Sequence, residues 1–122
     1  MTQMQTEPCY LTIREAGRLL QRRQVSPVEL TRAFLNRIEQ LDTKLKSYIT
    51  VLSDRALSEA RHAEAEILRG DYRGPLHGIP IALKDLYDTQ GIRTTASSRV
   101  MANRVPQEDA TTTARLAAAG SI

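Results

Sequence analysis

Apolar residues recur with helical spacing in the first half of the chain and predict three helices. We expect the first at residues 13–23, the second at 27–42, and a third that begins at Ser53 and ends before Gly70. Residues three or four positions apart share one face of a helix, so each pattern marks a stripe that can be buried. The stripes are Ile13, Ala16, Gly17 and Leu20; Leu30, Ala33, Phe34, Ile38 and Leu41; and Ala56, Ala60, Ala63 and Ile67.

Two of these helices carry a clear start signal. Thr12 with Glu15, and Ser26 with Glu29, have the spacing of a capping box, in which the hydroxyl and the carboxylate each accept a backbone N–H. Pro27 suits the first helical position because the N–H that it lacks would have no partner there. The second helix is therefore the best defined element in the sequence.

Two short apolar segments predict strands instead. Residues 48–52 are rich in β-branched and aromatic side chains, and residues 79–83 form an apolar run behind turn residues. Pro80 cannot donate to a ladder, so it is expected at the beginning of its strand. Because a helix separates the two strands, they predict the beginning of a parallel sheet. Residues 86–108 look irregular.

The last residues predict one more helix and a new strand. Asp109 is expected to cap a helix that Gly120 ends, and Ser121–Ile122 would open a further strand. The predicted fold class is therefore α/β, with N-terminal helices followed by the start of a mixed, mostly parallel sheet covered by helices. We expect a flexible segment at 1–10 and, at 11–122, the N-terminal part of a domain truncated at its C-terminal end.

Composition narrows the classes of function. Seventeen basic and fourteen acidic residues give a net charge of +3, but the two signs alternate along the predicted helices, which is typical of a solvated face and not of a nucleic-acid surface. Cys9 is the only cysteine, so neither an internal disulfide nor a cysteine-based metal site can form. We see no signal peptide and no membrane-spanning segment, and we expect a cytoplasmic protein.

Lys84 is the residue with the clearest chemical potential. It follows the apolar run 79–83, at the carboxyl end of a predicted strand, where active-site residues gather in open α/β sheets. Asp85 need not neutralise it, because successive side chains of a strand point to opposite faces. A lysine partly withdrawn from water can act as a general base. The alternative is an ordinary lysine whose stem lies on the sheet and whose ammonium reaches water.

The stretch "GPLHGIPIALKDLYDTQGIRTTASS", followed by "VPQEDATTTARLAAAGSI", resembles the amidase signature family of amidases and amidotransferase subunits. The resemblance extends over about residues 11–122 and is most specific from Gly74 to Thr95. It implies hydrolysis of a carboxamide, or transfer of its ammonia, through an acyl-enzyme and a Ser–cis-Ser–Lys triad. Lys84 falls on the triad lysine. The resemblance implies a small-molecule amide substrate and neither a metal nor an organic cofactor.

The sequence departs from the family in one respect. The two catalytic serines of the family lie in and after a downstream Gly-Ser-rich stretch, which we expect to lie outside this chain. Ser97 and Ser98 are not expected to replace them, because Arg99 and Val100 follow instead of glycines. The chain alone is therefore predicted to be inactive. Arg93, Thr94 and Thr95 are candidates for the substrate approach, without a choice among them.

Other polar residues are expected to be structural. His77 lacks a ligand partner at metal-binding spacing, and His62 is expected to be solvated on the charged third helix. Asp88 and Asp109 suit a turn and a helix cap. For the whole protein, the sequence that begins at Lys84, "KDLYDT", favours a general amidase, because the amidotransferase pattern has Asn after the Asp. The alternatives are the A subunit of a tRNA-dependent amidotransferase, with partner subunits and contact with tRNA, and a truncated, non-catalytic helical interaction module. A homodimer is left open.

Overall fold

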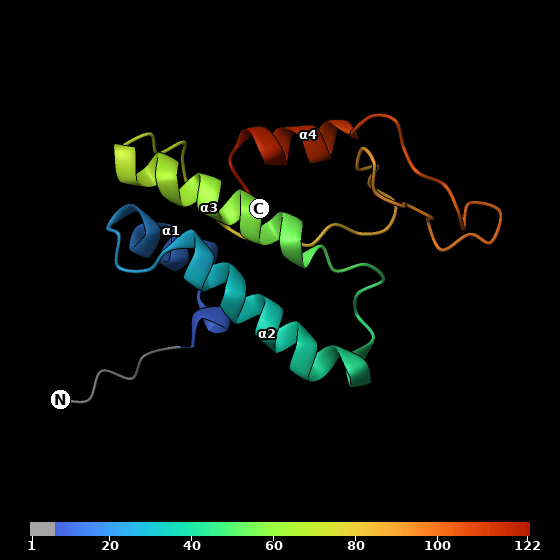
Figure 1. Cartoon of the computed structure of the whole chain (residues 1–122), viewed down its shortest axis with the longest axis horizontal. Coiled ribbons are helices and arrows are strands. Elements are labelled where there is room, and N and C mark those ends of the chain that lie inside the picture. Colours follow the sequence, from blue (N-terminus) through green and yellow to red (C-terminus); the bar gives the residue numbers. More distant parts are fainter. Residues whose placement is uncertain (1–6) are drawn as a thin grey trace.

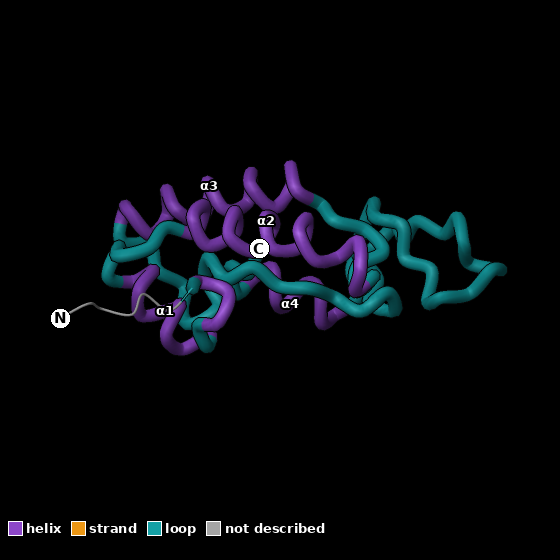
Figure 2. Tube along the Cα trace, turned by 90° about the horizontal axis from the view of Figure 1, so that it is seen from below, coloured by secondary structure: helices purple, strands orange, loops and turns teal. Residues whose placement is uncertain are grey.

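The protein was analysed as a computed structural model, which describes residues 7–122. The described part of the chain contains four α-helices, one short 3₁₀ helix and no strand. The helices α2 and α3 lie side by side, and the segment between α3 and α4 extends beyond the ends of the helices in both views (Figures 1 and 2). In chain order the elements are η1 (Pro8–Tyr10), α1 (Ile13–Gln21), α2 (Pro27–Leu45), α3 (Ser53–Arg69) and α4 (Thr111–Ala118).

Both predicted capping boxes are confirmed. At α1, the Glu15 N–H donates to the Thr12 hydroxyl at 3.2 Å, and the Thr12 N–H donates to the Glu15 carboxylate at 2.8 Å. At α2, the corresponding distances between Ser26 and Glu29 are 3.1 and 2.8 Å. Pro27 takes the first position of α2, as expected. These local interactions satisfy amides at the helix start that have no partner within the helix.

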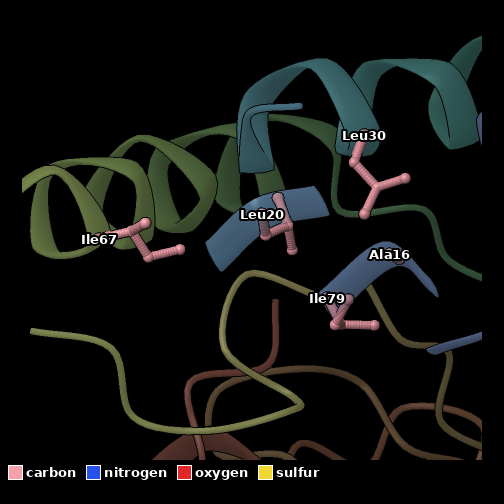
Figure 3. Packing of buried hydrophobic residues seen from close by; sticks show 5 residues of the cluster. All are labelled: Ala16, Leu20, Leu30, Ile67 and Ile79. Atoms are coloured by element: carbon pink, nitrogen blue, oxygen red, sulfur yellow. The ribbon is translucent and has the colours of Figure 1, made fainter. Parts of the chain in front are cut away.

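A small apolar core joins α1, α2, α3 and the segment that follows α3. Its buried members come from all four parts of the chain and converge between the helices in Figure 3. They are Ala16, Leu20, Leu30, Ile67 and Ile79. Most of the expected stripe residues of α1 and α3 are buried, but Ile13 is 53% exposed and Leu41, near the end of α2, is 38% exposed. The core is therefore concentrated around the first turns of α2 and does not follow its whole length.

The end of α3 is also confirmed. Gly70 follows the last helical residue with a φ of 94°, a left-handed conformation that favours glycine. α2 extends to Leu45, three residues beyond the predicted end, and closes with Lys46 in the left-handed region at φ 51°. None of the helices within residues 7–122 is both long and apolar enough to cross a bilayer.

The predicted strands at 48–52 and 79–83 are wrong for this structure, because neither segment has a regular ladder with a neighbour. The backbone of residues 48–51 makes no hydrogen bond to any other part of the described chain, and Ile49 is 59% exposed. A strand exists only through its partners, so β propensity alone does not produce one. The α/β fold class is accordingly not confirmed, and the mostly parallel sheet stays a prediction.

Residues 79–81 nevertheless pair with the last residues of the chain. The Ile122 N–H donates to the Ile79 carbonyl at 2.9 Å, and the Ile81 N–H donates to the Ile122 carbonyl at 2.8 Å. These two hydrogen bonds lie on either side of Pro80, which has no N–H to donate. Ile122 donates to the residue before Pro80 and accepts from the residue after it, which is the hydrogen-bond pattern of two parallel strands. This contact brings the end of the chain beside the segment that leads to Lys84.

The predicted cap of α4 is also wrong. The N-cap residue is Ala110, which has no side chain that can accept a hydrogen bond, and Asp109 instead accepts the Gln90 N–H at 2.7 Å. Asp109 therefore holds the loop at Gln90 and does not cap α4. The two residues are 19 positions apart in the sequence but lie close together in the fold. Gly120 ends the helical region with a φ of 84°, as expected.

The predicted flexible segment at 1–10 lies partly outside the described residues, which exclude residues 1–6. Within the described part, Tyr10 belongs to η1 and contacts α2. Its hydroxyl accepts a hydrogen bond from Arg37 at 2.9 Å, and the Arg37 guanidinium carbon lies 4.8 Å from the centre of the Tyr10 ring. Residues 8–10 are thus fixed to α2 by one arginine.

Candidate functional site

Lys84 lies on the wall of an open groove between the helices and the long loop. The groove has a volume of about 730 Å³ and is lined mainly by apolar surface. Its walls come from α2, α3, α4, the segments 47–52 and 80–85, and the loop 87–97. Phe34, Ile81 and Thr113 mark three of these walls. The groove combines apolar walls with a few polar side chains, among them Lys84, so it is the candidate site.

The Lys84 side chain is exposed and not half-buried. No carboxylate within residues 7–122 lies close enough to form an ion pair with its ammonium. The Lys84 backbone is fixed, because its carbonyl accepts the N–H groups of Leu86 at 2.7 Å and Tyr87 at 3.0 Å. The chain therefore turns directly after the lysine, and the turn sets where the side chain leaves the backbone.

Asp85 does not form an ion pair with Lys84, but the reason is not the predicted alternation of strand side chains, because the segment is not a strand. The Asp85 carboxylate faces the loop, where it accepts the Thr95 N–H at 2.9 Å and the Thr95 hydroxyl. The Ser97 N–H is a longer contact at 3.5 Å. The Thr95 hydroxyl, followed by the Thr95 N–H, lowers the pKa of the Asp85 carboxyl, so this group stays ionised at neutral pH.

A second carboxylate holds the base of the same loop. Asp88 and Arg104 form a two-pronged ion pair, with both nitrogen–oxygen distances at 2.6 Å. The hydrogen bonds from Arg104 lower the pKa of Asp88. The Asp88 carbonyl also accepts the Ala110 N–H at 2.8 Å and the Thr113 hydroxyl at 2.9 Å. Asp88 is therefore structural, as the sequence predicts, and connects the loop to the start of α4.

His77 is fully buried and holds the segment before Lys84 against α3. The Arg73 N–H donates to its Nδ1 at 3.1 Å, so Nδ1 is the acceptor and the proton is on Nε2, which faces a Glu66 oxygen at 2.9 Å. Arg73 also contacts Glu66 at 2.5 Å. This hydrogen bond, with a smaller contribution from His77, lowers the pKa of Glu66. The Tyr72 ring stacks on the imidazole with centres 5.9 Å apart.

The sequence indicates a structural role for His77 but not its partners. Glu66 lies 11 residues earlier on α3, and no local motif connects the two. His62, one turn before Glu66, is mostly exposed, as expected, and its Nε2 lies 3.4 Å from Glu66. Within residues 7–122, no group of three or more His, Cys, Asp or Glu side chains could hold a metal ion.

The remaining sequence candidates separate in the structure. Arg93, Thr94 and Ser97 line the groove together with Lys84, whereas Thr95 faces Asp85 instead. The Ser98 N–H donates to the Thr95 carbonyl at 2.9 Å, so the Ser97–Ser98 pair belongs to the loop's own hydrogen bonding. No sequence signal places Thr95 against Asp85, because ten positions of irregular chain separate them.

Comparison with known proteins identifies the family. The profile of the Amidase family matches residues 29–122, which include the groove wall and Lys84. The chain belongs to this family, and the resemblance to amidase signature proteins is confirmed. Among solved structures, it is similar to the peptide amidase from Stenotrophomonas maltophilia, with a TM-score of 0.85 and 33% identity over 93% of this chain and 23% of that one.

Two curated relatives are more similar in sequence. The chain is 46% identical over 113 residues to the A subunit of the glutamyl-tRNA(Gln) amidotransferase from Moorella thermoacetica, covering 93% of this chain and 23% of the relative. It is 48% identical over 112 residues to the protein of the same name from Geobacter metallireducens, covering 92% and 23%. The chain thus spans about a quarter of the length of these relatives.

Proposed function

We propose that the protein to which this chain belongs cleaves a carboxamide C–N bond through an acyl-enzyme, with Lys84 as the general base. Membership of the Amidase family supports the reaction class. The observation that supports the residue is the position of Lys84 on the groove wall, on a fixed turn and without an ion-pair partner in the described chain. No carboxylate of the described chain competes for this side chain, so it is open to a partner in the groove.

In this proposal, the neutral Lys84 amine takes a proton from a serine hydroxyl, through a second serine, while the serine oxygen attacks the amide carbon. When the C–N bond breaks, the proton passes to the leaving nitrogen and a serine ester remains. Water then hydrolyses the serine ester, which releases the carboxylic acid and restores the serine hydroxyl. In a transferase, the ammonia released in the first step would pass to a separate acceptor. Both serines would come from outside residues 1–122. The substrate would be a small amide bound in the groove.

The test of this role uses the product of the complete reading frame and three variants. Lys84→Met removes the amine. Lys84→Arg retains the positive charge, but its guanidinium does not lose a proton near neutral pH and so cannot act as a base. We expect both to lower kcat for ammonia release by at least ~100-fold. Lys44→Met is the matched control, because Lys44 lies in the exposed last turn of α2, outside the groove. Full activity of Lys84→Met or Lys84→Arg would overturn the proposed role.

A second candidate function is the A subunit of a tRNA-dependent amidotransferase. Identities of 46% and 48% to proteins with that name favour it. The sequence "KDLYDT" favours a general amidase instead. Ammonia release from benzamide by the protein alone would support the amidase. Glutamine hydrolysis that requires partner subunits and glutamyl-tRNA would support the amidotransferase.

The third alternative, a non-catalytic helical interaction module, is tested by the coding sequence. A reading frame that continues past Ile122 into a Gly-Ser-rich stretch would support the enzyme proposals. A reading frame that stops at Ile122, with no ammonia release from benzamide or glutamine, would support the module.

The homodimer and the cytoplasmic location stay predictions.

A further inference from the structure

Asp85 receives hydrogen bonds from three consecutive loop residues. The Thr95 N–H and hydroxyl and the Ser97 N–H reach its carboxylate, and the Ala96 N–H donates to its backbone carbonyl at 2.6 Å. Three successive amides of residues 95–97 thus face the residue directly after Lys84. A carboxylate that accepts several N–H and O–H groups at once is a strong local anchor.

The anchored loop has an unusual backbone. Ala96 and Ser97 both have positive φ angles, 49° and 56°, in the left-handed region that residues with a Cβ rarely adopt. Two consecutive left-handed residues persist only when their surroundings fix them. The Thr95 hydroxyl contributes directly, because it donates to Asp85 and accepts the Ser97 N–H at 3.2 Å.

The same anchor borders Lys84 on one side. The Lys84 carbonyl is held by the N–H groups of Leu86 and Tyr87, and the next residue is held by the loop. Lys84 and Ser97 line the same groove, whereas Thr95 is buried behind it at 7% exposure. The Asp85–Thr95 contact therefore connects two parts of the groove wall that are 13 positions apart in the sequence.

We propose that Asp85 and Thr95 are positioning residues, which hold Lys84 and the backbone of residues 96–97 in a fixed relation at the groove wall. The proposal rests on the proposed role of Lys84 as the base. Asp85 acts here through the loop and not as a counter-ion, because its carboxylate accepts from Thr95 and Ser97 and forms no ion pair with Lys84. Neither Asp85 nor Thr95 is assigned to the proton transfer itself.

The chain offers a matched pair of variants at Thr95. Thr95→Val retains the shape of the side chain and the N–H but removes the hydroxyl, whereas Thr95→Ser retains the hydroxyl and removes the methyl group. We expect Thr95→Val to lower kcat by roughly 10- to 100-fold, because small displacements of a catalytic group have effects of this size. We expect KM to change by less than about twofold, and Thr95→Ser to restore most of kcat.

Two controls separate this role from general loosening of the loop. Asp88→Asn weakens the ion pair with Arg104 in the same loop but leaves the contacts of Asp85 in place. We expect it to lower the melting temperature without lowering kcat. Amide hydrogen exchange of residues 95–97 provides a readout that does not depend on activity, and we expect faster exchange in Thr95→Val than in Thr95→Ser.

The outcomes distinguish this proposal from the one on which it rests. If Lys84→Met is inactive and Thr95→Val retains the wild-type kcat, the positioning role is wrong and the role of Lys84 stands. An equal loss of kcat in Thr95→Val and Asp88→Asn also contradicts the positioning role, because any loosening of the loop would then suffice. If Lys84→Met is fully active, both proposals fail.

Discussion

The imidazole of His77 packs directly against the α-carbon of Gly120. A Cβ placed on Gly120 would lie 2.5 Å from Cδ2 of the ring and 3.2 Å from the His77 α-carbon, closer than van der Waals contact allows. The Gly78 N–H donates to the Gly120 carbonyl at 2.8 Å beside this contact. The residue after α4 and the segment that leads to Lys84 are therefore fitted to each other at a position where only glycine has room.

We therefore expect Gly120→Ala to destabilise the fold strongly. An alanine at this position would be strained by the left-handed φ of 84° and would also clash with the buried His77 ring. Together the two effects should lower the free energy of unfolding by about 2 to 4 kcal/mol. Urea unfolding measures the loss. Gly70→Ala is the matched control, because Gly70 has a φ of 94° but no atom within 4 Å of the position that a Cβ would take. Equal losses in the two variants would contradict a steric role for His77.

The Glu66 carboxylate is expected to make stability depend on pH. Its pKa is lowered from 4.5, mainly by the hydrogen bond from Arg73, so its contribution to stability is complete above that value and is lost as pH falls through the lower folded value. Glu66→Gln is expected to cost about 1 to 2 kcal/mol at pH 7. The difference from wild type, measured by urea unfolding at several pH values, should shrink below pH 4.5. A difference that stays constant down to pH 3 would contradict this contribution.

The Ser26 capping box is expected to stabilise the start of α2. Ser26→Ala removes the hydroxyl that accepts the Glu29 N–H, at a cost of about 1 kcal/mol in the free energy of unfolding. Ser53→Ala serves as the control, because Ser53 is the first residue of α3 and its cap position is occupied by Leu52, without a side-chain hydrogen bond. Thermal unfolding of the two variants checks this. A larger loss in Ser53→Ala would contradict the assignment.

Leu20 is expected to be the most sensitive apolar position of α1. It is 1% exposed and packs in the core formed by the helices and Ile79, so Leu20→Ala should cost about 2 to 5 kcal/mol. Leu45→Ala removes the same atoms at the end of α2, where the side chain is 66% exposed, and should change stability by less than about 0.5 kcal/mol. Chemical denaturation of both variants tests this. Similar losses would mean that Leu20 is not a core residue.

Most of the helices could be predicted, and Lys84 could be selected as a candidate base, because the signals for both lie in the nearby sequence. The two residues of each capping box, Thr12 and Glu15 or Ser26 and Glu29, lie within one helical turn, and the apolar stripes repeat at the helical period. The apolar run before Lys84 and its likeness to the family were sufficient to select that residue as the candidate base. These features depend on neighbours in the sequence, so the sequence by itself determined them.

The tertiary structure decided everything that depends on distant partners. Residues 48–52 have strand propensity but no ladder, and Asp109 holds Gln90 instead of capping α4. His77 meets Glu66, and Asp85 meets Thr95, across irregular chain that carries no period. A hydrogen bond between residues far apart in the sequence forms only when the folded backbone brings them together. A local sequence pattern therefore does not predict such a bond. The sequence alone therefore determined the helices and the candidate lysine, and folding determined what surrounds that lysine.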